Sequence, residues 1–100
     1  MVKAFDGETS KDISLLCAKA ADELLTISDV TASFVLGDTG EKVCISGRSI
    51  GDINVQVILE KLGGGGHITL AGAQVEGMTL EEVKQELIIR INEYFTEIEN

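Results

Sequence analysis

The sequence is short of basic and aromatic residues. It has 8 Lys and Arg residues against 17 Asp and Glu, a formal net charge of −9, and only 4% of its residues are aromatic. Proteins that grip a long nucleic acid rely on Lys and Arg to displace counterions and on aromatic rings to stack against bases. Both shortages argue against that function. A small anionic ligand held in one pocket stays compatible with this balance, because salt screens distant charges.

Long apolar stretches and paired cysteine motifs are also missing. No apolar run approaches the roughly 18 residues of a membrane-spanning helix, and the N-terminus does not have the pattern of a signal peptide. Cys17 and Cys44 stand far apart within apolar patterns, so we interpret them as reduced core residues of a cytoplasmic domain. A domain cut from a membrane-anchored protein would have the same features.

The chain is long enough for one globular domain. It has 100 residues, of which 44% are hydrophobic and 25% charged, a composition typical of folded proteins. A chain of this size buries about 60–70% of the surface that it exposes when unfolded, which suffices for a single core. The sequence therefore predicts one domain over residues 1–100, without internal repeats.

Hydrophobic periodicity predicts an α/β fold. Apolar residues at helical spacing predict three helices, from about residue 13 to 27, after Asn54, and from about residue 80 to 98. Alternating residues predict strands at 2–5, 30–36, 42–48 and 72–76, with a hairpin connection at 37–41. We expect a small mixed β-sheet of about four to five strands, covered by these helices.

Caps and apolar stripes sharpen the helix predictions. Thr79–Glu82 is a clear capping box, and Thr9–Asp12 resembles one after a turn at Asp6–Gly7. We interpret the Glu-rich remainder of the last helix as a solvated face. The buried stripe expected on the first helix is Ile13, Leu16, Cys17, Ala20, Ala21, Leu24 and Leu25, and that on the last is Leu80, Val83, Leu87, Ile88, Ile91, Phe95 and Ile98.

Four consecutive glycines, Gly63 to Gly66, followed by His67, form the most distinctive motif. Glycine has no Cβ, so its amide can approach a ligand closely. Histidine donates a hydrogen bond or carries a positive charge near neutral pH. The run lies between a helical pattern and small apolar residues, whereas a flexible linker would mix glycine with serine between polar sequence. This context favours an anion-binding site over a linker.

A second polar motif, Ser46-Gly47-Arg48-Ser49, ends a predicted strand. Alternation would place Ser46 and Arg48 on the same face, and arginine offers a planar fork of donors that matches phosphate oxygens. Taken alone, an arginine at a strand end is more often an ordinary ion-pairing residue. Asn54 is equally well explained as a helix N-cap or as a ligand contact. The short helix between Asn54 and the glycine run would bring both its ends to one site with Arg48.

The residues provide no machinery for cleaving a phosphate. His67 is the only histidine, and one histidine without carboxylate or thiolate partners makes no metal site. There is no His/Asp cluster typical of a two-metal phosphotransfer centre, and the glycine run lacks the Lys-Ser/Thr of a P-loop. We therefore expect the chain to hold a phosphate without attacking it, and we assign no metal or cofactor to its own residues.

These motifs resemble those of a known family. Ser46–Ser49, Asn54–Ile58, Gly63–His67 and Ala71–Gln74 are similar to the DHH-associated C-terminal domain of the DHH phosphodiesterases. The closest resemblance is to the membrane-bound cyclic-di-AMP phosphodiesterases of the GdpP type. In those proteins, stretches similar to Ala20–Leu25 and Ile53–Val57 occur in the same order. The resemblance extends over about residues 12–91.

The resemblance implies a two-part enzyme. An N-terminal DHH domain, absent from this chain, would supply Asp and His ligands for two divalent metal ions, typically manganese, so the isolated chain would be inactive. The C-terminal domain would close over the cleft and bind a nucleotide or cyclic dinucleotide, with the DHH domain as its partner. Homodimerisation of the parent enzyme is left open. The substrate-binding residues implied are Arg48, Ser49, Asn54, Gly64, Gly65, Gly66 and His67.

Two positions depart from the family pattern, and other functions stay open. Leu70 stands where relatives usually have a small or polar residue, and Gly47 where many have Ala or Leu. One alternative is the equivalent domain of a nanoRNase or pAp phosphatase, which takes short linear nucleotides. Another is a nucleic-acid-binding module, as in RecJ-like nucleases and alanyl-tRNA synthetase, although the acidic balance weighs against it. A purely structural domain would leave the glycine run unexplained.

Overall fold

The fold is known from a computed structural model, which describes residues 2–5 and 10–99. A five-stranded sheet has the strand order β1-β2-β3-β5-β4. β1 runs parallel to β2, and the other neighbours are antiparallel, so the prediction of a small mixed sheet is confirmed. The strands are β1 (Val2–Phe5), β2 (Ala32–Asp38), β3 (Lys42–Ser49), β4 (Gly65–His67) and β5 (Leu70–Glu76).

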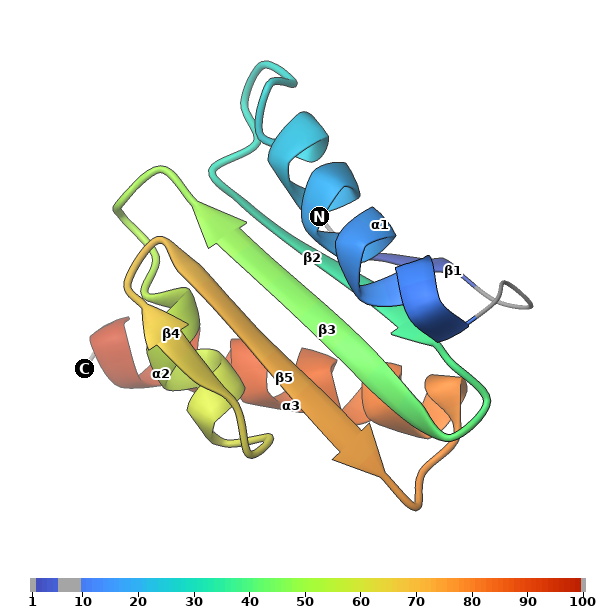
Figure 1. The fold of residues 1–100 in the computed structure, drawn as a ribbon. Coiled ribbons are helices and arrows are strands. Elements are labelled where there is room, and N and C mark those ends of the chain that lie inside the picture. The colour runs from blue at the N-terminus through green and yellow to red at the C-terminus, as the bar shows by residue number, and fades with distance from the viewer. Residues whose placement is uncertain (1, 6–9, 100) are drawn as a thin grey trace.

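Helices lie on both faces of the sheet. α1 (Ser10–Leu24) packs on one face, whereas α2 (Val55–Glu60) and α3 (Leu80–Glu99) pack on the other (Figure 1). These three helices, counted over the described residues, match the number predicted. α1 links the parallel strands β1 and β2, because such a pair needs a crossover rather than a tight turn.

The face of α2 and α3, called the closed face below, carries the larger core. Apolar side chains of β2, β3 and β5 pack there against both helices, and Leu36, Ile45, Leu59 and Leu87 are fully buried or nearly so. Burial of a leucine or isoleucine side chain stabilises the folded chain by about 1.5–3 kcal/mol. This core therefore supplies most of the apolar burial that holds the sheet and two helices together.

The opposite face, called the open face below, is covered only in part. There α1 packs Ile13, Cys17 and Ala21 against Val35 of β2. Gly37 permits this approach, because a Cβ at that position would lie 2.7 Å from Cys17 Sγ. Beyond α1, the near surface of β5 and β4 carries no helix in the part of the chain that Figure 1 draws as ribbon. The partial cover leaves polar and glycine residues of the sheet accessible.

The element boundaries differ from the predictions at several places. β2 begins and ends two residues later than the strand predicted at 30–36. The first helix ends at Leu24 rather than near residue 27, in a turn where Thr26 N–H donates to the Glu23 carbonyl over 3.0 Å. β5 begins at Leu70, two residues before the predicted strand. β4 was not predicted at all, because we interpreted the glycine run as a ligand-binding loop, whereas it pairs with β5 as an edge strand.

Several residues of the predicted apolar stripes are exposed. On α1, Leu16 is 41% exposed, because the helix packs mainly on β2 and β3 and buries only the narrow stripe of Ile13, Cys17 and Ala21. On α3, Val83 and Leu87 are buried, but Phe95 and Ile98 in the last turns are 38% and 58% exposed. That half of α3 extends past the residues that the closed face can cover.

The helix caps match the predictions where the structure describes them. Thr79 Oγ1 accepts from Glu82 N–H over 3.1 Å, and Glu82 Oε1 accepts from Thr79 N–H over 2.8 Å, so the predicted capping box is confirmed. The turn at Asp6–Gly7 and the first residue of the Thr9–Asp12 box lie outside the described residues. None of the described helices is long and apolar enough to cross a membrane.

Candidate functional site

A glycine-lined groove of about 540 Å³ lies on the open face, between α1 and β4. Its size falls within the usual range for small-molecule sites. Ser14 of α1 forms one side and the turn after α2 the other, with β3 and β5 beneath. The residues that line it are Ser14, Ile45, Ser46, Gly63, Gly64, Gly65, Gly72, Ala73 and Gln74.

One cross-strand row forms the floor of this groove. Ser46 of β3 is opposite Gly72 of β5, which is opposite Gly65 of β4. Residues directly opposite in antiparallel strands place their side chains on the same face, so the row offers one hydroxyl beside two positions of bare backbone. No hydrogen bond within the described chain engages the Ser46 hydroxyl, and it is not among the buried unpaired atoms. Solvent therefore reaches it. Ser46 was recognised in the sequence as a neighbour of Arg48 but not as a site residue.

Three glycines of the run have structural reasons to be glycine. Gly63 ends the turn after α2 with φ +85. A Cβ at Gly64 would lie 2.6 Å from the Ala73 Cβ, and the Gly64 N–H already donates to the Leu59 carbonyl over 2.9 Å. Gly66 has φ +145 and sits against the backbone of Ala71. The fold itself accounts for these three, and the Gly64 amide is not free to bind a ligand as predicted.

At Gly65, neither the backbone conformation nor the packing requires glycine. Among the glycines that the structure describes, it alone has neither a positive φ nor any atom within 4 Å of the place where a Cβ would be. That place opens onto the groove, since Gly65 lies in the floor row. Glycine in a strand costs about 0.5–1 kcal/mol relative to alanine. The absence of a side chain here serves no packing purpose within the domain.

Arg48 lies one row beyond the floor and is anchored at two points. Its Nε–H donates to Asp22 Oδ1 over 2.8 Å, and Nη1 donates to the Gly47 carbonyl over 2.9 Å. As predicted from strand alternation, Arg48 shares the open face with Ser46, since Asp22 belongs to α1. The ion-pairing role considered for a strand-end arginine is thus present. Its use as a ligand contact stays a prediction.

His67 is exposed and belongs to the same row as Arg48. Leu70 of β5 stands between them, opposite both, so two strand spacings, roughly 10 Å, separate the two backbones. Leu70 is 50% exposed. Neither Arg48 nor His67 lines the groove, so the expectation that one depression contains them with the whole glycine run is met only in part. They flank it, with an apolar side chain between them.

Ser49 and Asn54 have structural roles. The Ser49 hydroxyl donates to the Ile53 carbonyl over 2.7 Å and so holds the loop after β3. Asn54 Oδ1 accepts from the Val57 N–H over 3.1 Å, which is the N-cap of α2. The cap explanation of Asn54 is therefore confirmed. A ligand contact by either residue stays a prediction, and neither lines the groove.

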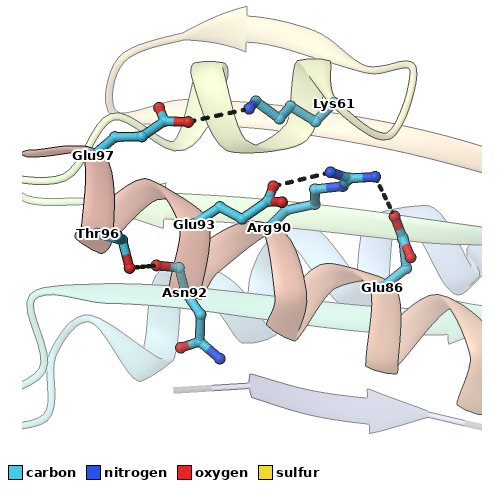
Figure 2. A network of polar contacts seen from close by, with 7 residues as sticks. All are labelled: Lys61, Glu86, Arg90, Asn92, Glu93, Thr96 and Glu97. Carbon is cyan, nitrogen blue, oxygen red and sulfur yellow. Dashed lines mark hydrogen bonds and ion pairs between the residues drawn. The ribbon is translucent and has the colours of Figure 1, made fainter.

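A second polar cluster, on α3, is a poor site for an anion. Figure 2 shows Arg90 between two carboxylates, with Glu86 at 2.6 Å and Glu93 at 2.9 Å, and Lys61 reaching Glu97 at 3.7 Å. Hydrogen bonds to Glu93 and Glu86 raise the pKa of the Arg90 guanidinium. Glutamate side chains pair with both cations, whereas the sequence predicted only a solvated helix face.

Metal ligands do not gather in the described part of the chain. No group of three or more His, Cys, Asp or Glu side chains there could hold a metal ion. The two cysteines are both buried, and burial raises the pKa of the Cys17 thiol to about 11. Among the described residues, the candidate site presents one arginine, one histidine, one free hydroxyl and a bare stretch of backbone.

One protein-family model covers most of this sequence. The DHHA1 domain matches residues 5–97 of this chain. The chain therefore belongs to the DHHA1 domain family, and the resemblance to the DHH-associated domain is confirmed.

Two relatives and one solved structure extend this assignment. Cyclic-di-AMP phosphodiesterase GdpP of Geobacillus thermodenitrificans is 54% identical over 82 residues, which make up 81% of this chain and 12% of that protein. GdpP of Bacillus subtilis is 49% identical over 82 residues, again 81% of this chain and 12% of that protein. An exopolyphosphatase-related protein from Bacteroides fragilis has a TM-score of 0.67 at 26% identity, covering 80% of this chain and 24% of that one. The chain thus spans about an eighth of the length of the relatives that it matches.

Proposed function

We propose that this chain is the substrate-binding domain of a DHH-family phosphodiesterase, and that its groove receives a phosphate of a cyclic dinucleotide. The relatives that are named cyclic-di-AMP phosphodiesterases supply the substrate class. The hydrolytic residues and two metal ions, expected to be manganese, would come from a DHH domain elsewhere in the parent enzyme. This domain would bind and orient the substrate against it.

The observation that carries the proposal is Gly65. A floor position that neither backbone conformation nor packing requires to be glycine is explained if a ligand occupies the space of the missing side chain. Ser46 would donate its free hydroxyl to that ligand, and Arg48 and His67 would reach the phosphate from the adjoining row. Leu70, between those two, would lie against an apolar part of the ligand such as a base.

The isolated domain should bind weakly. Two or three charge-assisted hydrogen bonds contribute about 1.5–3 kcal/mol each, and association costs at least about 4 kcal/mol in lost freedom. The surplus is at most about 5 kcal/mol, which corresponds to a dissociation constant of the order of 1 mM or weaker. Metal ions that would neutralise the phosphates are expected only in the DHH domain, and the chain itself carries a net charge of −9.

A titration of the 100-residue chain with cyclic di-AMP, followed by NMR, tests the proposal. We expect the amide signals of Ser46, Gly65 and Gly72 to shift and Gly65→Ala to weaken binding at least about threefold, because the added methyl fills the floor. Gln85→Ala, on α3 across the sheet, is the matched control and should bind like the wild type. Unchanged affinity of Gly65→Ala, or shifts confined to α3, would show that the groove is not the site.

Two further measurements separate this function from its alternatives. The chain should not hydrolyse cyclic di-AMP with or without Mn²⁺, because the described residues include no metal-ligand cluster. Turnover that is lost on substituting one of its own residues would contradict the fragment interpretation. Salt-sensitive binding of long single strands, tighter than that of cyclic di-AMP, would favour a nucleic-acid-binding module instead.

A further inference from the structure

We propose that Asp22 is a positioning residue of this site: it holds the Arg48 guanidinium by its Nε–H, so that the Nη2 end of the fork is presented to an anionic ligand. The inference rests on the proposed function and deepens it. Asp22 comes from α1, which so far has served only as cover and as one side of the groove. The role would make this helix part of substrate recognition.

Arg48 and Asp22 differ strongly in how far their side chains are exposed. The Arg48 side chain is only 11% exposed, whereas that of Asp22 is 64% exposed. An ion pair with an exposed carboxylate usually adds little to folding stability, so stability alone does not explain this pair. What it fixes is the arginine: Nε is held by Asp22 and Nη1 by the Gly47 carbonyl.

These two anchors use only part of the guanidinium. An arginine has five N–H donors, and the two hydrogen bonds named above leave three, both of those on Nη2 among them. In the described chain Nη2 has no hydrogen-bond partner, yet it is not a buried unpaired atom. It is therefore open to solvent. A buried fork with one accessible end is suited to donate to a phosphate oxygen without first being ordered.

The sign of the effect separates positioning from simple charge. If Asp22 acted only through its charge, its removal would increase the positive potential near Arg48 and tighten the binding of an anion. If it positions Arg48, its removal frees a side chain with many rotamers, and the cost of ordering it again weakens binding. The two explanations thus predict opposite changes in affinity for the same substitution.

The experiment compares Asp22→Ala, Asp22→Asn and a control, Glu23→Gln, in the 100-residue chain titrated with cyclic di-AMP. Glu23 is exposed, lies on the same helix and carries the same charge, so its neutralisation reports the electrostatic change alone. Asparagine keeps an oxygen that can accept from Nε. We expect Asp22→Ala to raise the dissociation constant at least about threefold, and Asp22→Asn and Glu23→Gln to stay within about twofold of the wild type.

The side-chain Nε–H signal of Arg48 gives a readout that does not depend on affinity. It should be sharp and slow to exchange with water in the wild type and in Asp22→Asn, and lost in Asp22→Ala. Equal or tighter binding by Asp22→Ala, or an unchanged Nε–H signal, overturns the positioning role. If the wild type does not bind cyclic di-AMP, both the proposed function and this inference are wrong. If the wild type binds and Asp22→Ala binds as tightly as Asp22→Asn, only the inference is wrong.

Discussion

The two faces of the sheet are built from the same strands, yet they are composed differently. On β3, Val43 and Ile45 point to the closed face and Ser46 to the open face; on β5, Ala73 points to the closed face and Gly72 to the open face. The strand period of two separates these sets completely. On the closed face most positions fill the core with an apolar side chain. On the open face, beyond α1, side chains are small, absent or polar, apart from the exposed Leu70.

This difference shows which residues the fold selects and which it does not. A buried apolar side chain on the closed face is explained by the core around it. A bare backbone position on the open face weakens the strand, and at Gly65 nothing inside the domain compensates. The contrast points to a surface shaped by a ligand or by a partner domain, and the following experiments either break it or sharpen it.

Replacing a leucine by alanine on each face should give the largest difference in the free energy of unfolding. Leu59 is fully buried on the closed face, and Leu70 is 50% exposed on the open face. Leu59→Ala should lower the free energy of unfolding by about 2–5 kcal/mol, because it leaves a cavity. Leu70→Ala should change it by no more than about 0.5 kcal/mol. Urea unfolding measures both, and equal losses would mean that the open face is part of the core.

Two adjacent glycines should also behave differently. Gly64→Ala places a Cβ against the backbone of β5 and should cost about 1–3 kcal/mol of stability. Gly65→Ala meets open space at an ordinary φ, so stability should stay the same or rise by up to about 1 kcal/mol. Thermal unfolding of the two variants compares them directly. A marked destabilisation by Gly65→Ala would reveal a structural demand that the packing around it does not explain.

The α1 side of the open face should respond to alkaline pH. Burial raises the pKa of the Cys17 thiol from its ordinary value of 9.0 to about 11. Between these values the unfolded chain releases a proton that the folded chain keeps, so stability falls as pH rises, by up to about 1.4 kcal/mol per pH unit. Urea unfolding from pH 8 to about 11 measures this slope.

The control for this pH dependence is Cys17→Ala. It removes the thiol, so its stability, although lower overall, should fall less steeply over the same pH range. The Cys44 thiol, whose pKa burial also raises, is present in both proteins, so the difference between the two curves reports the Cys17 thiol. Parallel curves would contradict the assignment of the slope to Cys17.

The smallest effect concerns Asn54. Asn54→Ala removes the N-cap of α2 and should cost about 1 kcal/mol, whereas Asn54→Asp keeps a capping oxygen and should cost little. If Asn54 is only a cap, cyclic di-AMP should bind equally well to both variants once each is folded. An affinity loss in Asn54→Asp at unchanged stability would instead assign this residue to the ligand.

Much of the fold could be predicted from periodicity. The strands predicted at 30–36 and 42–48 correspond to β2 and β3, and the Thr79–Glu82 box marks the start of α3. β4 could not be predicted, because Gly-Gly-His has no alternation and low strand propensity, and it becomes a strand only through its pairing with β5. Exposure of Leu16 follows likewise from how little of the sheet α1 covers, which local spacing does not encode.

The motifs of the candidate site could be recognised in the sequence, but the separate roles of its residues could not. The sequence pointed to the glycine run, and the groove contains Gly63 to Gly65. It could not tell that Gly64 is needed for packing and Gly65 is not, since that depends on the distance to β5. Nor could it pair Arg48 with Asp22, which lies 26 positions earlier in the chain. Contacts between distant positions depend on how the elements pack, and a single sequence leaves them open.

The brevity of β4 has a consequence for self-association. β4 forms one edge of the sheet, and an edge strand offers unpaired backbone groups to which a strand of another molecule can add. Here that edge is only three residues long, two of them glycines. An added strand would find a ladder too short to hold it and only one side chain, that of His67, to pack against. The same bare backbone that leaves room for a ligand thus protects this end of the molecule from aggregation by strand addition.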